Sequence, residues 1–425
     1  MSASGPGRGK SPIQLTDLTL AQGDARTLRG VLGRYLNHQM RAFLSVPMRL
    51  IEPDNRALYS VVAGWMQRLV RENRGQALAA LRPPTQNGLI APISRAAAAD
   101  GDHAALNLWL RELCLLLLVE LAVRGQLPEQ GIGWQAQGIE VPTLRSIAAN
   151  LELRFERPIE GLHFRAGEVE VRASDGHWRV ALNPDVDPAV EAAPFSFARP
   201  YHRIVPGVSL ALTDNNPLSD FEAHPDKDGN QLDLGDHSVE QWLDSLRGCF
   251  ERVDRYLPLL GEELRMVASL IVPVGFDPEK HLSASYKEVI GTAYMTLHPN
   301  PMTMVEALVH EFQHNKINAA FYLDPLLKNA FWPLYTSPVR PDPRPLHGVI
   351  LAVHAFQPVA ALYQAMVDAD DPMAANPSWR KRFADIVAKN HSGATTVLDH
   401  ADPTEVGIGL FEEMRALDEA ASGWA

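Results

Sequence analysis

Cysteine is scarce in this sequence of 425 residues, because only Cys114 and Cys249 are present. The two lie far apart, and no Cys-x-x-Cys motif occurs. The sequence therefore predicts neither a disulfide framework nor a cysteine zinc site. This cysteine usage fits a reducing compartment, and a cytoplasmic location is expected.

Basic residues are also fewer than acidic residues. Lys and Arg total 39 against 51 Asp and Glu, which gives a formal net charge of -12. This balance argues against nucleic acid or an anionic membrane as a partner.

The first ten residues are small and polar, lack the apolar segment of a secretory signal, and are expected to be disordered. The most apolar window, Leu113–Val123, is interrupted by Glu120 and is too short to span a bilayer, so we expect a buried core helix.

The order of patterns along the chain predicts an α+β protein. A largely helical N-terminal region is followed by a mixed α/β C-terminal region, in which a strand precedes the helix that carries His310-Glu311-x-x-His314, a zincin-like order. The expected boundaries are a lead at 1–20, a helical region at 21–135, a mixed region at 136–265 and a metal-binding catalytic region at 266–425. Helices are expected at Ala25–Val46, Asn55–Leu81, Ala98–Arg124 and Ser238–Leu257, and strands at Leu151–Phe155, Glu168–Arg172, His177–Leu182, Val267–Val274 and Ser283–Leu297.

The most specific chemical signal is a His-Glu-x-x-His element formed by His310, Glu311 and His314. Residues four apart on a helix lie one above the other, so the two imidazoles can bind one metal ion. Asn300-Pro301 predicts the start of this helix, which places the histidines well inside it. Glu306 fits a capping box and needs no metal to explain it. The motif predicts a metal-dependent enzyme.

The sequence after the motif lacks the third ligand of the familiar peptidases. Ile317 and Ala320 stand where a metzincin has its glycine and its third histidine. The next glutamate after Glu311 is Glu405, too far for the thermolysin arrangement. These peptidase families therefore fit poorly.

A third ligand is expected instead from an apolar helical run, Val349–Val367, which contains His354. A lone histidine on such a helix is usually a core residue, yet the nearby pair makes His354 the preferred third ligand. His347, two helical turns earlier, and Asp324 or Asp342 are the alternatives.

A proline-rich loop before this helix carries Arg340 and Arg344. Guanidinium groups on a stiff loop close to a metal can hold a carboxylate through two hydrogen bonds. Surface salt bridges are the other reading of both arginines. If one of them does bind a carboxylate, a dicarboxylate co-substrate such as 2-oxoglutarate follows.

The segment from Gly291 to Phe356 resembles the HExxH-motif peptide-modification family, through the histidine motif, the run Ser337-Pro338-x-Arg340-Pro341-Asp342-Pro343-Arg344-Pro345-Leu346, Gly348 and His354-Ala355-Phe356. The resemblance covers about the C-terminal third strongly. It implies an iron(II)- and 2-oxoglutarate-dependent oxygenase that hydroxylates a side-chain β-carbon of a ribosomally made precursor peptide. By the same likeness, His310, His314 and His354 would hold the metal, and Arg340 or Arg344 would anchor 2-oxoglutarate.

Three functions remain as hypotheses. The first is the oxygenase, in which Glu311 orients a ligand or water. The second is a zinc metallopeptidase, in which Glu311 is the general base. The third is a non-catalytic protein that only binds a peptide. The sequence leaves the role of the N-terminal helical region open, between a peptide-docking surface, a homodimer contact and other roles.

Overall fold

The structure, a computed structural model, describes residues 14–101, 103–136, 138–188, 191–221, 223–224, 227–338 and 342–424. The α+β class is confirmed: a helical region over residues 26–123 precedes several small sheets, and helices follow at the C-terminus. The chain divides into two compact units, and each consists of separate stretches of sequence. The first unit comprises Met1–Arg34, Val253–Glu263 and Lys316–Ala425, and the second comprises Tyr35–Arg252 and Leu264–Asn315.

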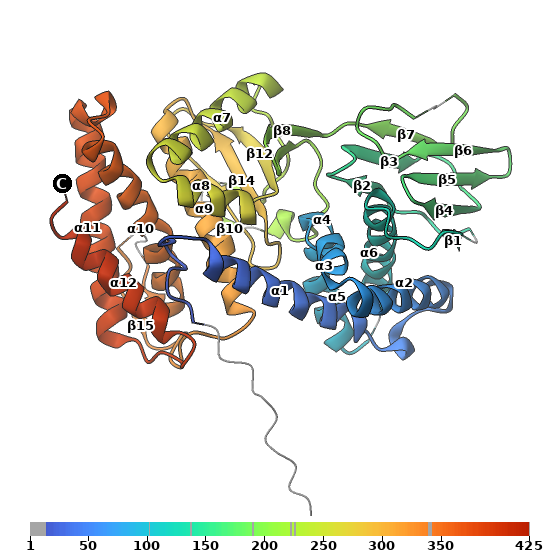
Figure 1. Cartoon of the computed structure of the whole chain (residues 1–425), viewed down its shortest axis with the longest axis horizontal. Helices are drawn as coiled ribbons and strands as arrows, with labels where there is room; N and C mark the ends of the chain where they lie inside the picture. Colours follow the sequence, from blue (N-terminus) through green and yellow to red (C-terminus); the bar gives the residue numbers. More distant parts are fainter. Residues whose placement is uncertain are drawn as a thin grey trace, which may run out of the picture. The chain divides into compact units, whose positions relative to one another are not determined.

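The N-terminal helices follow the expected pattern with two differences. The helix expected at Asn55–Leu81 is wrong as a single element, because the backbone leaves the helical region at Asn73 (φ -149°, ψ 69°). The short helices at Pro84–Asn87 and Ile90–Ala98 were not expected. The helices of this region are α1 (Arg26–Leu44), α2 (Pro53–Glu72), α3 (Arg74–Leu81), α4 (Pro84–Asn87), α5 (Ile90–Ala98) and α6 (Ala104–Val123) (Figure 1).

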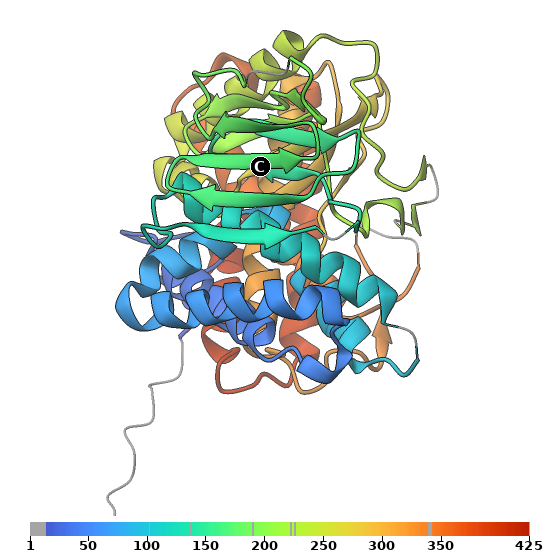
Figure 2. The same ribbon diagram turned by 90° about the vertical axis from the view of Figure 1, so that its right-hand side faces the viewer.

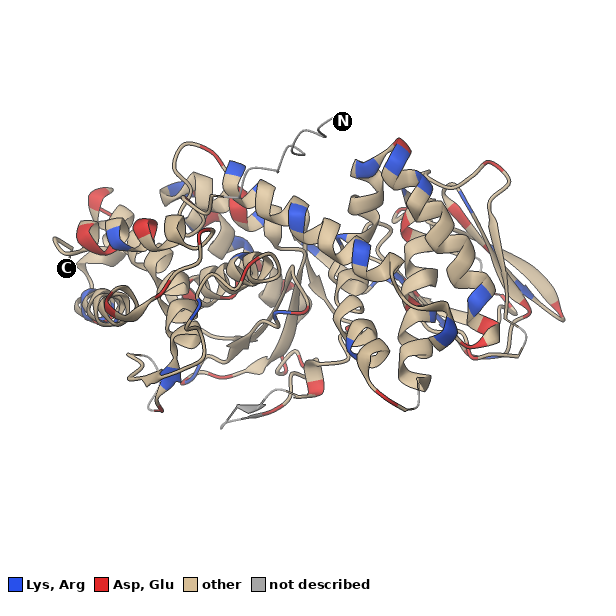
Figure 3. Ribbon diagram, turned by 90° about the horizontal axis from the view of Figure 1, so that it is seen from below, with Lys and Arg blue, Asp and Glu red and all other residues tan. Residues whose placement is uncertain are grey.

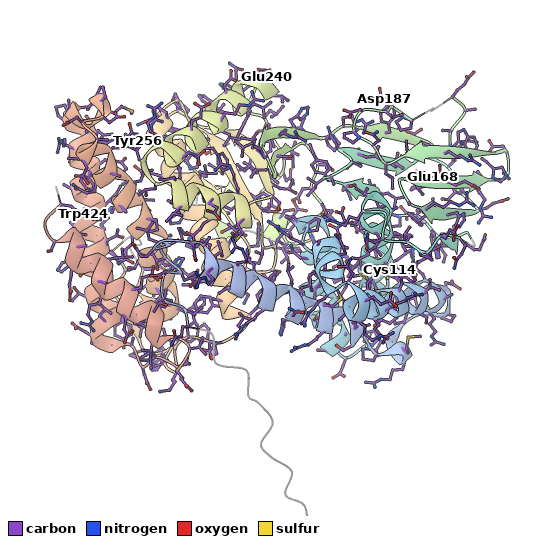
Figure 4. The ribbon with its side chains drawn as sticks, viewed as in Figure 1. Cys114, Glu168, Asp187, Glu240, Tyr256 and Trp424 are labelled. Carbon is purple, nitrogen blue, oxygen red and sulfur yellow. The ribbon has the colours of Figure 1, made fainter. Side chains whose placement is uncertain are left out.

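Helix α6 forms the core of the second unit, as its apolar sequence predicts. Leu113 to Leu118 are completely buried, and Cys114, labelled in Figure 4, is a buried free thiol. The helix packs against α2, α5 and the strands β2 (Leu144–Ser146), β4 (Gly161–Arg165) and β5 (Glu168–Ala173).

Two antiparallel sheets complete this part of the second unit (Figure 2). One has the strand order β1-β4-β5-β6, and the other has the order β2-β3-β7. Val169 and Val171 are buried on one face of β5, as their alternation with charged residues predicts. The remaining strands of these sheets are β1 (Ile132–Gln135), β3 (Leu151–Phe155), β6 (Gly176–Ala181) and β7 (Phe195–Ala198).

The sheet next to the motif has the order β13-β14-β12-β9-β8. Its three inner strands are parallel neighbours, and β13 and β8 run antiparallel at the two edges. The strand expected at Ser283–Leu297 is wrong as one element, because the chain reverses before Gly291, whose φ of +104° favours glycine. The strands are β8 (Tyr201–Val205), β9 (Val208–Ala211), β12 (Leu270–Phe276), β13 (Ser283–Ala284) and β14 (Thr292–Leu297).

The remaining helices include α7 (Val239–Tyr256), α8 (Pro258–Val267) and the motif helix α9 (Pro301–Phe321). In the first unit, α10 (Leu346–Asp368), α11 (Pro377–His400) and α12 (Ile408–Ala421) pack side by side (Figure 1). Helix α10 is the one described helix long and apolar enough to cross a membrane, but most of it is buried within the protein. Figure 3 shows basic and acidic residues interspersed along the helices. Short strand pairs are β10 (Ala223–His224) with β11 (Lys227–Asp228), and β15 (Leu334–Tyr335) with β16 (Arg344–Pro345).

Candidate metal centre

Helix α9 begins where the sequence predicts, at Pro301. The side-chain oxygen of Asn300 accepts the backbone N–H of Met302 at 2.9 Å, which satisfies one of the free donors of the first turn. Most of the helix is buried, and its partly exposed positions after the first residue are Thr303, His310, His314 and Phe321. These positions are spaced by seven, four and seven residues, so they form one stripe along the helix. Both histidines lie on that stripe.

The two imidazoles of the motif converge. The Nε2 atoms of His310 and His314 lie 2.9 Å apart, and the ring planes are nearly perpendicular at 83°. Metal–nitrogen bonds of about 2.0–2.1 Å place two ligand nitrogens roughly 3 Å apart on one ion. A single hydrogen bond between the rings would give a similar distance, with one Nε2 donating to the other. The pair therefore fits two ligands of one metal.

The protonation state of the His314 imidazole suits a metal ligand. Its Nδ1 atom is buried, although part of the residue is exposed, and burial lowers the pKa of the ring to about 4. The imidazole is therefore neutral near pH 7, which is the form that binds a metal. Among the described residues, no hydrogen-bond acceptor faces the Nδ1 atom of His314.

Glu311 is held by an edge strand of the neighbouring sheet. Its side chain is almost completely buried, and the Ser283 hydroxyl donates a hydrogen bond of 2.7 Å to its Oε1 atom. Ser283 lies on β13, opposite Met295 of β14. This contact orients the carboxylate of the residue that follows the first metal-binding histidine.

Asn315 fixes the motif helix to β14. Its side-chain oxygen accepts the backbone N–H of Gly291 at 2.7 Å, and its amide donates to the carbonyl oxygens of Thr292 at 3.2 Å and Glu311 at 2.9 Å. Asn315 is fully buried, so these bonds replace water for all the groups involved. Gly291 is tightly enclosed, because a Cβ there would lie 3.1 Å from the carbonyl oxygen of Val267. The helix is therefore joined to the start of β14 by the residue that follows His314.

The candidate third ligands all belong to the first unit. His354 is completely buried within α10. The ring of His347 stacks near Phe321, with 4.4 Å between the ring centroids. Asp324 is engaged locally, since it accepts hydrogen bonds from the backbone of Leu326 and from the Thr404 hydroxyl. Within the described ranges, no three side chains of His, Cys, Asp or Glu are gathered as a metal-binding group, so the third ligand stays a prediction.

The two arginines expected to hold 2-oxoglutarate are also in the first unit. Arg340 lies outside the described residues. Arg344 lies on β16 and forms an ion pair with Asp342, with its Nε atom 2.8 Å from the carboxylate. Both partners of this pair are exposed, so the interaction is weak and a stronger carboxylate ligand could displace it.

Two residues of this site were not singled out from the sequence. Ser283 could not be identified, because its approach to Glu311 depends on the pairing of two strands and not on local spacing. Asn315 directly follows the motif, but Gln313 and Lys316 beside it are polar as well, so its residue type alone did not distinguish it. In comparisons with known proteins, neither a family model nor a curated protein matches this chain.

Proposed function

We propose that this chain is an iron(II)- and 2-oxoglutarate-dependent oxygenase that hydroxylates a side-chain β-carbon of a ribosomally made precursor peptide. The observation that carries the metal-binding part is the convergence of the His310 and His314 Nε2 atoms at 2.9 Å on the partly exposed stripe of α9. The choice of an oxygenase rests on the resemblance of the segment Gly291 to Phe356 to the peptide-modification family.

The arrangement around the histidines supports a zincin-like reading of the fold. Strand β14 leads into α9, and the short antiparallel strand β13 forms the edge of the sheet beside the motif. His310 and His314 would hold the metal, with His354 as the proposed third ligand. Iron(II), when bound, supplies the redox chemistry with dioxygen and 2-oxoglutarate. Arg340 or Arg344 would hold the distal carboxylate of 2-oxoglutarate.

Glu311 has a positioning role in this proposal. Its Oε1 atom is already engaged by Ser283, and its burial limits its exchange with bulk water. A carboxylate fixed in this way can orient a metal ligand or a bound water through hydrogen bonds.

A zinc metallopeptidase is the second candidate. The observation in its favour is that Glu311 adjoins the histidine pair in sequence and on the helix, with an orientation fixed by Ser283. In such an enzyme the glutamate would accept a proton from the attacking water. The two candidates therefore assign different importance to the same carboxylate.

Metal content and peptide mass separate the candidates. The protein is loaded anaerobically with iron(II), transferred to air with 2-oxoglutarate and a genomically neighbouring small peptide, and analysed by mass spectrometry. The oxygenase predicts consumption of 2-oxoglutarate and a peptide heavier by one oxygen atom. Loss of bound metal in His310→Ala, with retention in the exposed control His177→Ala, tests the ligand assignment independently of turnover.

Other outcomes would overturn the proposal. Peptide cleavage that Glu311→Gln abolishes, with metal retained, would establish the peptidase instead. Protein that takes up no metal and modifies no peptide, although it binds one, would support the non-catalytic alternative.

A further inference from the structure

One edge of the β1-β4-β5-β6 sheet is open in the second unit. β1 pairs with β4 alone among the described strands, and Figure 2 shows it as the strand of this sheet nearest α2. An open edge presents a row of backbone donors and acceptors that can pair with another extended chain. The free edge of β1 therefore needs an explanation.

The hydrogen-bond alternation of an antiparallel pair identifies the residues that face this edge. The backbone N–H of Ala136 donates to the carbonyl oxygen of Glu160 at 2.8 Å, so every second residue of β1 from there is bonded to β4. The intervening residues, Gly133 and Gln135, direct their N–H and C=O groups away from β4. Both residues are exposed, and neither backbone has a partner on that side within the described chain.

A cavity of about 620 Å³ lies beside this edge. It is lined by one face of α2 and by the segment that enters β1, namely Val61, Gly64, Trp65, Arg68 and residues 128–133. The volume is within the range of about 300–1,000 Å³ that is typical of ligand sites. The cavity therefore reaches the free strand edge at Gly133, and Gln135 continues that edge beyond the cavity. The cavity and the edge are together called the groove.

Glycines occur on both walls of the groove where the fold itself does not require them. Gly64 lies in the interior of α2, yet no described atom is within 4 Å of a Cβ built there. A Cβ at Gly133 would make only ordinary contacts, the nearest at 3.7 Å from the ring of His163. Glycine inside a helix or a strand is destabilising, and in a strand it often marks a place where another backbone approaches closely.

Trp65 and Val61 form an apolar surface on the α2 side of the groove. The indole N–H of Trp65 donates to the carbonyl oxygen of Gln126 at 2.8 Å, which fixes the ring. The Arg68 guanidinium lies 5.0 Å from the centre of the same ring, and Val61, one turn away, is 47% exposed. A fixed aromatic ring beside an exposed valine can receive an apolar side chain.

We propose that this groove docks an extended peptide segment, which adds to β1 as a further strand. Its backbone bonds the outward N–H and C=O groups of Gly133 and Gln135, and an apolar side chain contacts Trp65 and Val61. Gly64 and Gly133 leave room for its backbone between helix and strand. The inference rests on the proposed peptide substrate, and it assigns recognition to a surface built from the N-terminal helical region and the first strand.

We assign a peptide and not a small molecule to the groove, because the groups without a partner among the described residues are the backbone N–H and C=O groups of alternate residues on a β-strand, Gly133 and Gln135. An extended chain repeats the same groups at intervals of about 6.8 Å on one side, which matches alternate residues of β1. A second copy of this chain, joined edge to edge through β1, is the alternative that the experiment must separate.

The test uses the full-length protein and a displayed library of short random linear peptides. Enriched sequences are synthesised with a fluorescent label, and their dissociation constants are measured by anisotropy. Gly64→Leu fills the groove and should weaken binding by at least about tenfold, although leucine favours the helix and should stabilise it. Gly30→Leu, at an exposed position of α1 with nothing within 4 Å, is the matched control and should bind normally.

A second variant and a backbone measurement examine the strand pairing. Gly133→Pro removes an outward N–H without breaking a bond to β4, so it should also weaken binding. Amide hydrogen exchange of Gly133 and Gln135 should slow when the peptide is bound. His310→Ala should bind the peptide like the wild type, so a chemical defect is distinguished from a docking defect.

Four results would overturn the inference, the last of them without affecting the proposed function. The first is a library that yields no binder, and the second is peptides that Gly64→Leu binds as tightly as Gly30→Leu does. The third is slower exchange at Gly133 that depends on protein concentration without any peptide, which would assign the edge to a homodimer. Modification of a peptide by Gly64→Leu at the wild-type rate and KM would leave the proposed function intact and remove the docking site alone.

Discussion

Replacing Lys316 should destabilise the first unit more than any surface change, because this lysine is completely buried beside Glu263. The two side chains are both 0% exposed, and the Lys316 ammonium lies 2.8 Å from the Glu263 carboxylate. The ammonium also donates to the carbonyl oxygen of Thr19 at 3.3 Å. Lys316 lies on α9 two residues after His314, and this pair holds the last turns of the helix within the first unit.

The magnitude follows from desolvation. In Lys316→Met the Glu263 carboxyl loses its partner inside the protein, and burial already raises its pKa. Removing one member of a buried ion pair typically costs about 3–5 kcal/mol, whereas replacing both members by apolar residues is often nearly neutral. We therefore expect Lys316→Met to lower the free energy of unfolding by about 3–5 kcal/mol, and the double variant Lys316→Met with Glu263→Leu to recover most of this loss.

Guanidinium unfolding, followed by circular dichroism and by fluorescence, measures all four members of the cycle. Coincident transitions would validate a single unfolding free energy for each protein. The reasoning would be refuted if Lys316→Met lost less than about 1 kcal/mol, which is the value of an exposed pair. It would also be refuted if the double variant were less stable than either single variant.

Three further predictions concern the supports of the motif and the contact of Glu413 with the N-terminal segment. Ser283→Ala should leave the metal content unchanged and lower turnover by about tenfold, because Glu311 loses the hydroxyl that orients it; unchanged turnover would contradict this role. Asn315→Ala leaves buried backbone groups of β14 without their partner, so chemical denaturation should show a loss of about 2–3 kcal/mol, and a loss below 0.5 kcal/mol would count against it. Glu413 accepts the backbone N–H groups of residues 18–20, and burial raises its pKa from 4.5 to about 7. The folded state therefore binds an extra proton between these values, so Glu413 makes wild-type stability fall as the pH rises from 4.5 to 7. Unfolding experiments at several pH values should show a smaller slope for Glu413→Gln than for the wild type, and an equal slope would contradict the assignment.

Local patterns in the sequence predicted the elements whose side chains repeat regularly. The alternation around Val169 and Val171 predicted β5, and the apolar window around Cys114 predicted the buried helix α6. The start of α9 followed from Asn300-Pro301, since cap chemistry is local. These features depend on neighbours only a few residues apart.

Features that depend on distant residues were missed. The strand expected at Ser283–Leu297 is two strands, because the chain reverses between β13 and β14. Gly291 precedes β14 and is enclosed by Val267 and Pro84, which are distant in sequence, so a short window could not show why glycine is required there. The contact between Ser283 and Glu311 requires the register of β13 on β14, which no short window encodes. The break at Asn73 was missed because both flanking segments favour a helix.

The interleaving of the two units affects how the chain can fold during synthesis. The first unit needs residues near both ends of the sequence, since the Glu413 carboxylate binds the amide of Leu18 across 395 positions. The ribosome releases residues in order, so this unit cannot be completed until the chain has been made as far as α12. Contacts over such separations slow folding and prolong the exposure of apolar surface. No single cut in the chain yields an intact first unit, and a truncated C-terminal fragment beginning at Lys316 should be insoluble when expressed alone.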